Sequence, residues 1–429
     1  MKYNEYLTKK KDYQELGSLL LLERKHACLF YEPGKGKTYP CIDAVREVNK
    51  LKNGNANVLV LSTADAIRNM WEVEIVPQNI MPKNTVYMTF NSAIVEKTAN
   101  ELLKIKWDVI IVDECHKVKS NTAKTSKLVY KLSKKCEYCW GLTGTPRGNT
   151  DVDIFCQFKN LNISEWGAIS YTNFVNTCCT VDNKFFNGQM IKIPTGIKDE
   201  YKAGWERNIC KYTQRVEYDE TDNMPELNID LIELPYVPTK EYLQAEDGVI
   251  KVSDYESTMT KLVAMLKLQQ AVNGFLYLTD GVEEKRDVYI IERNKKLDWL
   301  KENLNINEKN VIVYRFDADL KAIQNEFEQV YITDSIKEFK ENNQKKILLL
   351  QCSRCESFNL QMCNNIIYYT MDYSYIKFKQ MMHRIWRTGQ DKQANIKILT
   401  FKDTVETKIW NAVKNKKKFA ELFMSIKGV

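Results

Sequence analysis

Proline and glycine are scarce in this sequence of 429 residues, which contains nine prolines and sixteen glycines. This scarcity excludes a collagen-like chain and a low-complexity chain rich in these two residues. The sequence also lacks any apolar run close to the roughly 20 residues that a membrane-spanning helix needs. The first apolar run, Leu19 to Leu22, is closed by Glu23 and Arg24 and does not resemble a signal peptide. We therefore expect a soluble, cytoplasmic protein with no membrane partner.

Histidine is rarer still, with three residues, whereas cysteine is frequent, with twelve. Without a secretion signal, the cysteines are expected to remain reduced, and the pairs Cys136/Cys139 and Cys352/Cys355 are interpreted as thiols in preference to zinc ligands. The formal net charge of +7 permits a polyanionic partner but does not require one. The length corresponds to roughly two to four domains.

Short apolar runs alternate with amphipathic stretches in the first third of the chain and again near its end. Such alternation predicts parallel strands joined by helices, an α/β fold with covered sheet faces. We expect two lobes, residues 1–225 and 226–429, with an insertion at about 151–210 and a helical insertion at about 240–290. The expected strands lie at 28–31, 58–61, 86–90, 109–112, 140–142, 311–314, 347–350 and 365–369. The expected helices include 39–52, 120–134, 239–246 and 257–272.

A glycine-containing turn, Glu32 to Thr38, follows the first apolar run and precedes an expected helix. This order is that of a phosphate-binding loop, in which Gly34 and Gly36 let backbone N–H groups turn toward phosphate oxygens. Lys37 would supply positive charge to the phosphates, and Thr38 a hydroxyl to Mg²⁺. A chance Gly-Lys-Thr in a turn is the alternative, because Tyr31 stands where the general pattern has glycine.

An acidic pair, Asp113 and Glu114, directly follows the apolar run Val109 to Val112. Carboxylates at the carboxyl end of a parallel strand face the ligand crevice. Asp113 could hold Mg²⁺, and Glu114 could orient or deprotonate an attacking water. A strand that ends in a polar turn is the alternative, which the upstream loop makes weaker.

Two arginines lie in a stretch near the C-terminus that is expected to be helical, Gln380 to Gln390. Gln380, Arg384 and Arg387 are spaced i, i+4 and i+7, which places them on one helix face. Two arginines on one face can stabilise charge that develops on a γ-phosphate. An amphipathic helix with solvated arginines is the alternative reading of this stretch alone.

Together these motifs resemble the Snf2 (Swi2/Snf2)-type ATPase motor of helicase superfamily 2, from about Gln14 to about Lys418. Further segments match the family's motifs in order. They are Gln14, resembling the adenine-reading glutamine; Ser62-Thr63 with Trp71 and Glu74 (motif Ia); Thr89 to Asn91; Asp113 to Ser120 (DEAH box); Gly141 to Asn149 (motif III); Asp372-Tyr373; Gln380 to Gln390 (motif VI); and Asp403 to Glu406.

The resemblance implies two RecA-like lobes with ATP and Mg²⁺ in the cleft between them. It implies nucleotide binding by Gln14, Gly34, Lys35, Gly36, Lys37, Thr38 and Gln380, and a metal site at Thr38 and Asp113. It implies catalysis by Lys37, Asp113, Glu114, Arg384 and Arg387. Coupling to nucleic acid would involve Thr63, Thr89, Asn91, Thr143, Thr145 and Asn359.

Two segments depart from the family pattern. Motif V is normally glycine-rich, but here only Asn359 and Leu360 fit within the stretch from Cys352 to Leu360. Motif VI usually has aspartate before its first arginine, and this chain has His383. The first departure puts ribose or nucleic-acid contacts at motif V in question.

The family likeness implies an ATP-dependent DNA translocase or helicase that holds the backbone of single- or double-stranded DNA. The chain resembles compact bacteriophage-encoded forms, for which we expect a role in replication, recombination or repair in the host cytoplasm and a protein partner for targeting. An RNA helicase and an ATP-switched nucleic-acid scaffold are the alternatives. The wording of motif III and the Arg-x-Gly-Gln ending favour DNA, whereas the altered motif V motivates the scaffold.

Overall fold

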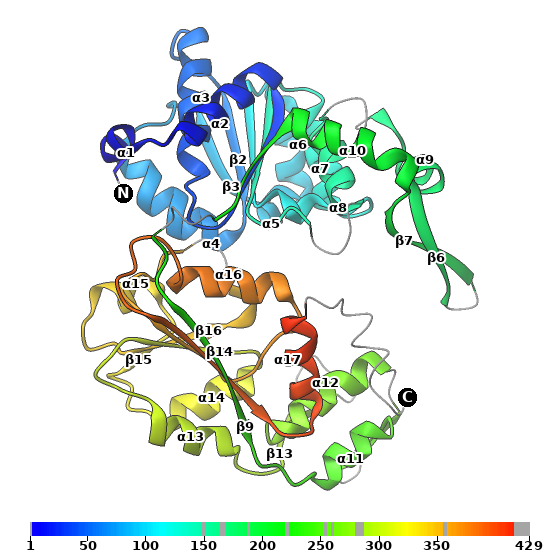
Figure 1. The fold of residues 1–429 in the computed structure, drawn as a ribbon, viewed down its shortest axis with the longest axis vertical. Helices are drawn as coiled ribbons and strands as arrows, with labels where there is room; N and C mark the ends of the chain where they lie inside the picture. Colours follow the sequence, from blue (N-terminus) through cyan, green and yellow to red (C-terminus); the bar gives the residue numbers. More distant parts are fainter. Residues whose placement is uncertain are drawn as a thin grey trace. The chain divides into compact units, whose positions relative to one another are not determined.

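The computed structural model describes residues 2–147, 152–163, 168–186, 189–218, 223–252, 255–258, 261–278, 287–354 and 358–415. The chain divides into two compact units, Met1–Asp222 and Asn223–Val429. Each unit is built on a six-stranded sheet in which all neighbouring strands are parallel (Figure 1). The predicted α/β class with two parallel sheets is therefore confirmed.

The sheet of the first unit has the strand order β3-β2-β4-β5-β1-β8. Its strands are β1 (His26–Tyr31), β2 (Val58–Ser62), β3 (Thr85–Thr89), β4 (Val109–Asp113), β5 (Tyr138–Thr143) and β8 (Thr213–Val216). Five of them coincide with predicted apolar runs, although Phe90 begins a helix instead of ending β3. The edge strand β8 was not predicted.

Helices cover both faces of this sheet, which is why its central strands are apolar throughout. The helices and short turns are α1 (Tyr3–Lys9), α2 (Asp12–Arg24), α3 (Thr38–Leu51), α4 (Ala64–Ala66), the π-helix η1 (Ile67–Ile75), η2 (Val76–Gln78), α5 (Phe90–Ala93), α6 (Glu96–Lys104), η3 (Cys115–Val118), α7 (Lys124–Ser133) and α8 (Val152–Asn160). Leu21 and Val45 of α2 and α3 belong to one buried cluster. Leu102 of α6 and Leu128 of α7 belong to a second buried cluster, which contains the strand residues that point to the other face of the sheet.

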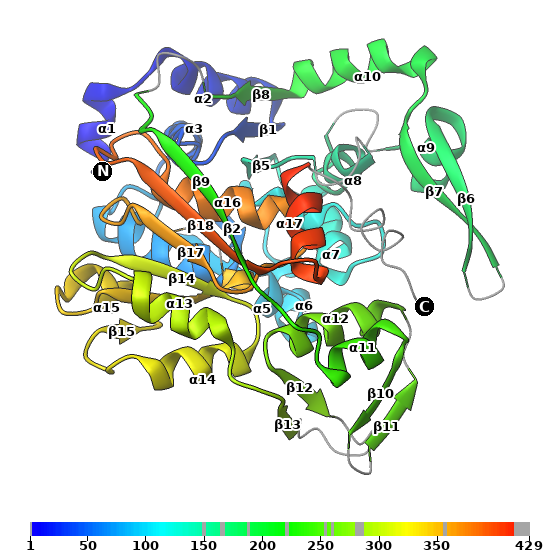
Figure 2. The same cartoon turned by 60° about the horizontal axis from the view of Figure 1, so that its bottom comes forward.

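The insertion in the first unit contains helices α9 (Tyr171–Cys178) and α10 (Asp199–Tyr212) and an antiparallel hairpin, β6 (Cys179–Phe186) with β7 (Gln189–Ile197). Figure 2 shows α9 and this hairpin beyond α8, at the end of α10 away from β8. The hairpin was not predicted.

The sheet of the second unit has the order β15-β16-β14-β17-β18-β9. Its strands are β9 (Leu227–Leu234), β14 (Asn310–Tyr314), β15 (Ile332–Thr333), β16 (Ile347–Gln351), β17 (Asn365–Tyr368) and β18 (Ala394–Phe401). Its helices are α11 (Lys240–Glu246), α12 (Lys261–Val272), α13 (Lys295–Asn303), α14 (Asp317–Glu326), α15 (Ile336–Glu341), η5 (Cys352–Arg354), α16 (Tyr375–Ile385) and α17 (Val405–Lys414).

The insertion expected to be helical at 240–290 is only partly so. It contains two antiparallel hairpins, β10 (Val249–Val252) with β11 (Tyr255–Thr258) and β12 (Phe275–Leu278) with β13 (Asp287–Ile290). Ser257 lies in β11, so the helix expected from that residue begins at Lys261. The helix expected at 239–246 is α11, with Thr239 as its N-cap.

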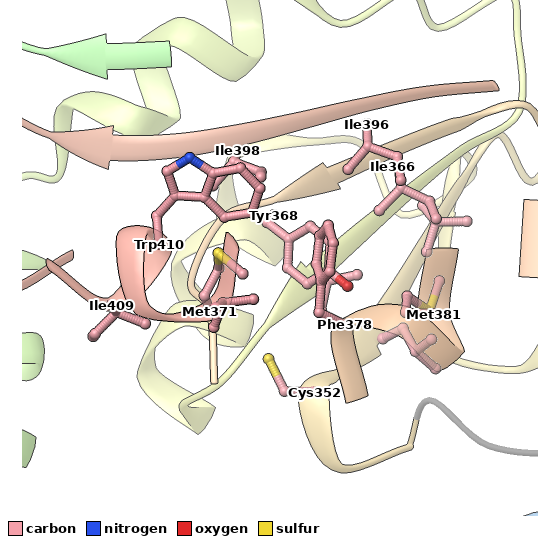
Figure 3. Packing of buried hydrophobic residues seen from close by; sticks show 14 of the residues in the cluster. Cys352, Ile366, Tyr368, Met371, Phe378, Met381, Ile396, Ile398, Ile409 and Trp410 are labelled. Atoms are coloured by element: carbon pink, nitrogen blue, oxygen red, sulfur yellow. The ribbon is translucent and has the colours of Figure 1, made fainter. Parts of the chain in front are cut away.

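One face of the second sheet packs against α16 and α17 (Figure 3). Phe378 of α16 meets Trp410 of α17 edge to face, with ring centroids 5.5 Å apart. Both rings lie in one buried cluster with Tyr368 of β17 and Ile398 of β18. This packing fixes α16, which follows β17 and carries the arginine motif.

Candidate functional site

Four neighbouring strands of the first unit, β2, β4, β5 and β1, end at one edge of the sheet. Asp113 at the end of β4 is level with Leu142 of β5, and Phe30 of β1 is level with Thr143. Because the strands are parallel, the segments after them meet at the same edge, where ligands bind in open α/β sheets. The structure therefore brings the predicted phosphate loop and the acidic pair to one place.

The loop after β1 has the backbone of a phosphate cradle. Gly34 and Gly36 have φ angles of 92° and 73°, in the region that glycine adopts at little cost. A Cβ on Gly36 would lie 2.8 Å from Gln14 Nε2, so the end of the Gln14 side chain would have to move. Helix α3 then begins at Thr38, which puts a helix N-terminus behind the loop.

Gln14 of α2 lies against this loop. Its Nε2 donates to the carbonyl of Lys35 over 3.4 Å, and Tyr13 Oη donates to the same carbonyl over 3.1 Å. Lys35 itself is buried, and its Nζ lies 5.3 Å from the centroid of the Tyr218 ring. These contacts hold the shape of the loop, while direct nucleotide contact by Lys35 and Gln14 stays a prediction.

Asp113 is almost fully buried and is held by three donors. Its Oδ2 accepts from Trp71 Nε1 and from Ser62 Oγ, each over 3.1 Å. Its Oδ1 accepts from the backbone N–H of Glu114 over 3.1 Å. Burial, and then the neighbouring Glu114 carboxylate, raise the pKa of Asp113, while Lys37 and the two side-chain donors act in the opposite direction.

Glu114 adopts left-handed backbone geometry with φ 54°. Such a conformation is uncommon outside glycine and asparagine and is often found at functional sites. Its Oε1 lies 3.7 Å from Lys37 Nζ, and its Oε2 lies 3.4 Å from His116 Nδ1. The lysine of the phosphate loop and the second residue of the acidic pair are therefore adjacent.

His116 connects the acidic pair to the predicted motif III. Its Nδ1 is 3.0 Å from Thr143 Oγ1, and that oxygen also accepts from the backbone N–H of Thr145 over 3.1 Å. The imidazole, Thr143 and Thr145 are all buried. The imidazole of His116 thus connects Glu114 to Thr143, and the Thr143 hydroxyl in turn binds the backbone of Thr145. Gly148 and Asn149, the end of motif III, lie outside the described residues.

The other predicted coupling residues of the first unit follow β2 and β3. Thr63 Oγ1 accepts from the N–H of Ala66 and caps α4, and Thr89 Oγ1 accepts from the N–H of Ser92 and caps α5. Asn91 is exposed. Both threonine hydroxyls therefore have a structural role, and their contact with nucleic acid stays a prediction.

The arginine motif of the second unit requires one correction. Gln380 and Arg384 lie in α16, but the helix ends at Ile385, and Trp386 is extended with ψ 92°. Arg387 therefore does not continue the helical face that the spacing i, i+4, i+7 assumed. Arg384 is mostly buried and donates from Nη1 to the carbonyl of Phe358 over 3.0 Å.

The end of the arginine motif is bound to motif V. Gln390 Nε2 donates to the carbonyls of Gln361 and Cys363, over 2.9 and 3.0 Å. Gln361 Nε2 donates to the carbonyl of Thr388 over 2.7 Å, and Asn359 Nδ2 donates to Gln361 Oε1 over 2.9 Å. Asn359 is thus joined to the Arg-x-Gly-Gln turn, although residues 355–357 lie outside the described ranges.

His383, which stands where the family pattern has aspartate, is buried and stacks on Trp386 with ring centroids 5.2 Å apart. Burial, and then the charges of Lys379, Arg384 and Arg387, lower the pKa of His383 to about 3. The imidazole is therefore neutral near pH 7.

Sequence reasoning missed the donors around the acidic pair. Trp71 was placed in the segment resembling motif Ia, whereas in the structure it is fully buried and its N–H binds Asp113. The available signal was chemical, because a buried tryptophan N–H usually finds an acceptor. In the second unit, Arg315 Nη1 donates to the buried Gln269 over 2.6 Å, and its guanidinium lies 4.3 Å from the ring centroid of Tyr373, which follows the predicted Asp372.

No group of three or more His, Cys, Asp or Glu side chains within the described residues is arranged to hold a metal ion without other ligands. Across the same part of the chain, no helix has both the length and the apolar character needed to cross a membrane.

Comparison with protein families gives two matches in order along the chain. The SNF2-related domain matches residues 76–184, and the helicase conserved C-terminal domain matches residues 267–389. The first match includes the acidic pair, and the second includes the arginine motif up to Gly389.

Comparison with curated proteins gives distant relatives. The ATP-dependent helicase YqhH of Bacillus subtilis is 21% identical over 430 residues, covering 89% of this chain and 73% of the relative. The SWI/SNF-related matrix-associated actin-dependent regulator of chromatin subfamily A-like protein 1 of Drosophila melanogaster is 23% identical over 416 residues, covering 90% of this chain. The chain spans 52% of the length of that Drosophila protein. The DNA repair protein RAD5 of Saccharomyces cerevisiae is 39% identical over 77 residues, which is 18% of this chain and 6% of RAD5.

Among solved structures, the chain is similar to the SWI2/SNF2 ATPase core of Sulfolobus solfataricus in complex with dsDNA. The sequence identity is 19% and the TM-score 0.41, with 97% of this chain and 92% of the other covered.

Proposed function

Because this chain belongs to the SNF2-type family of ATP-dependent helicases, we propose that it hydrolyses ATP when nucleic acid is bound and uses the energy to move along DNA. The observation that carries this proposal is the geometry at the carboxyl edge of the first sheet. Lys37, Asp113 and Glu114 meet there beside a loop with the backbone of a phosphate cradle.

The residues at this edge match the requirements of phosphoryl transfer. Lys37 would neutralise charge on the β- and γ-phosphates, and the N–H groups around Gly34 and Gly36 would bind phosphate oxygens. Glu114 would orient the attacking water and accept its proton. Its position next to Lys37 and His116 keeps the carboxylate near the phosphates and in contact with motif III.

The side chains also fit a Mg²⁺ ion, which prefers oxygen ligands. An ionised aspartate has about four lone-pair sites, and protein donors take three on Asp113, which leaves Oδ1 able to accept one more partner. Thr38 adds a hydroxyl at the start of α3. When bound, the ion would neutralise charge on the transferred phosphoryl group.

In the second unit, Arg384 and Arg387 would stabilise negative charge on the γ-phosphate during hydrolysis. Gln380 is buried, and its Oε1 has no hydrogen-bond partner within the described residues. An unsatisfied buried amide is costly, so a ligand donor at Gln380 would be favourable. This supports its predicted role in nucleotide binding.

DNA is the proposed track, held through its phosphate backbone and therefore in a salt-dependent way. The net charge of +7 is compatible with this partner, and relatives over a short segment are named as DNA repair proteins. Thr63, Thr89 and Asn91, after neighbouring strands β2 and β3, are the proposed backbone contacts of the first unit. A role in replication, recombination or repair, with a protein partner for targeting, follows as part of the proposal.

The test is steady-state ATP hydrolysis by the full chain with single-stranded DNA, duplex DNA, a forked DNA and RNA. Stimulation by DNA is expected, with a loss of roughly 100-fold or more in Glu114→Gln, because a general base contributes about 10²–10⁴-fold. Glu101→Gln is the matched control, since Glu101 is exposed and pairs only with Lys104 among the described residues.

Stimulation by RNA alone would replace DNA with RNA as the partner. ATP binding without turnover on any nucleic acid would refute the motor and favour the ATP-switched scaffold. Equal activity of Glu114→Gln and Glu101→Gln would refute the assigned role of Glu114.

A further inference from the structure

The segment from Ile67 to Ile75, η1, is a π-helix, a form that is rare at this length and is frequent at functional sites. The backbone N–H of Val76 bonds to the carbonyl of Trp71, five residues earlier, as the π form requires. Three residues of the segment, Ile67, Trp71 and Ile75, are buried at intervals of four. These three residues form the inward row of the segment.

Two consecutive residues of this π-helix contact the two side chains expected to hold Mg²⁺. Trp71 Nε1 donates to Asp113 Oδ2 over 3.1 Å, and Thr38 Oγ1 donates to Met70 Sδ over 3.8 Å. Ser62, at the end of β2 and before this helical segment, supplies the second donor to Asp113 Oδ2 over 3.1 Å. The three contacting side chains come from two elements, β2 and η1.

The direction of these hydrogen bonds matters for cation binding. A hydroxyl that donates its hydrogen to Met70 turns its lone pairs away from that sulfur. A carboxylate whose Oδ2 is saturated by Trp71 and Ser62 keeps its remaining acceptor site on Oδ1. Partners that orient metal ligands in this way affect metal affinity strongly.

We propose that Trp71, with Ser62 and Met70, is a positioning residue that fixes the orientation of Asp113 and Thr38 toward Mg²⁺. The proposal rests on the proposed function, because it takes the metal ligands from it. It gives the π-helix a purpose, because two consecutive residues of this segment, Met70 and Trp71, each contact one of the two ligands. Trp71 thereby acquires a role beyond filling the core.

The experiment measures binding of fluorescent N-methylanthraniloyl-ADP to the full chain as Mg²⁺ is titrated, with no turnover required. Trp71→Phe keeps an aromatic ring and removes the N–H. Its matched control is Trp140→Phe, since Trp140 is equally buried in the same cluster and donates to the carbonyl of Leu21 over 3.0 Å. Ser62→Ala removes the second donor with little change in volume, so the test survives if Trp71→Phe does not fold.

The Mg²⁺ concentration for half-maximal binding is expected to rise about 10-fold or more in Trp71→Phe, as for other partners that orient metal ligands. Ser62→Ala and Met70→Leu should shift it in the same direction by less. Trp140→Phe should not shift it, and affinity without Mg²⁺ should be the same in all variants.

Equal Mg²⁺ dependence in Trp71→Phe, Ser62→Ala and Trp140→Phe would overturn the proposal. So would an affinity loss in Trp71→Phe that is as large without Mg²⁺ as with it, because that result indicates only a disturbed core. This readout is independent of hydrolysis: a chain that binds nucleotide with Mg²⁺ but does not turn over ATP would refute the proposed motor and leave the positioning role intact.

Discussion

A buried ion pair joins helices α13 and α17 of the second unit. Lys296 in α13 is fully buried, and its Nζ lies 2.6 Å from Glu406 Oε1 in α17. The same ammonium donates to the carbonyl of Tyr369 over 2.7 Å and to Asn273 Oδ1 over 3.1 Å. An ammonium has three donors, so each one has a partner. Glu406 in turn accepts from Asn273 Nδ2 and from the N–H of Phe401.

Replacing Lys296 with methionine keeps most of the side-chain volume and removes the charge. Glu406, which is 4% exposed, would then be a buried carboxylate without its cation. Removing one member of a buried pair costs about 3–5 kcal/mol. At roughly 2–4 °C per kcal/mol for a unit of this size, the Tm of the second unit should fall by roughly 6–20 °C.

The assay is thermal and urea unfolding, with hydrogen exchange in β18 and α13 to assign the transition to the second unit. Lys104→Met is the matched control, because Lys104 and Glu101 pair over 2.8 Å with side chains 70% and 62% exposed. This control should change stability by about 0.5 kcal/mol or less.

The double variant Lys296→Met/Glu406→Gln should regain part of the loss, because no unpaired charge stays buried and the amide oxygen still accepts from Phe401. The cycle of the two single variants and the double variant gives the coupling free energy. A loss below about 1 kcal/mol in Lys296→Met, similar to that of Lys104→Met, would contradict the reasoning from burial.

Four further variants test the electrostatics and the backbone. The pKa of His383 is lowered to about 3, so its contribution to stability is complete above the unfolded pKa of about 6.5 and is lost as the pH falls toward 3. In thermal unfolding at graded pH, His383→Gln should lose less stability than the parent over this range. An unchanged dependence of stability on pH would contradict this assignment. Burial raises the pKa of Asp319 to about 6, so the pH dependence of its contribution to stability is opposite to that of His383. This contribution is present below about pH 4 and is lost as the pH rises through about 6. The stability of Asp319→Asn relative to the parent should therefore increase across that range. Gly36→Ala should weaken nucleotide binding about 10-fold or more, because φ 73° is unfavourable for alanine and its Cβ would meet Gln14. Gly204→Ala in α10, where a Cβ has open space, should raise the unfolding free energy by about 0.5–1 kcal/mol in urea denaturation.

The central strands of both sheets were predictable because parallel strands covered on both faces are apolar at every position. The edge strand β9 was not, since its exposure alternates along Leu227–Leu234 and its sequence includes Asn228, Asp230 and Glu233. The strand β18 carries Asn395 and Lys397, which interrupt its apolar pattern. The hairpin β6–β7 had a signal that was overlooked, because the sequence reads Asn-Gly at 187–188, a typical hairpin dipeptide.

The residues of the candidate site were individually recognisable from motif spacing, but the links between them were not. The bond from Trp71 to Asp113 depends on the packing of η1 beside β4, and spacing along the chain does not determine packing. The end of α16 at Ile385 was also hidden, because no proline or glycine occurs before Gly389 to mark it. Arg387 was therefore assigned to a helical face that does not extend so far.

The two departures from the family pattern have different physical consequences. At motif V, the part that the structure describes keeps its connection to motif VI, because Asn359, Gln361 and Gln390 join the two segments by side-chain hydrogen bonds. At His383, a neutral imidazole replaces a carboxylate, so the end of α16 carries its arginine charge without an acidic residue at that position. A more positive helix end favours an anionic ligand. The substitution therefore alters the charge of the arginine motif in the direction that phosphate binding requires, and the connection between motifs V and VI does not depend on the glycines that the chain lacks.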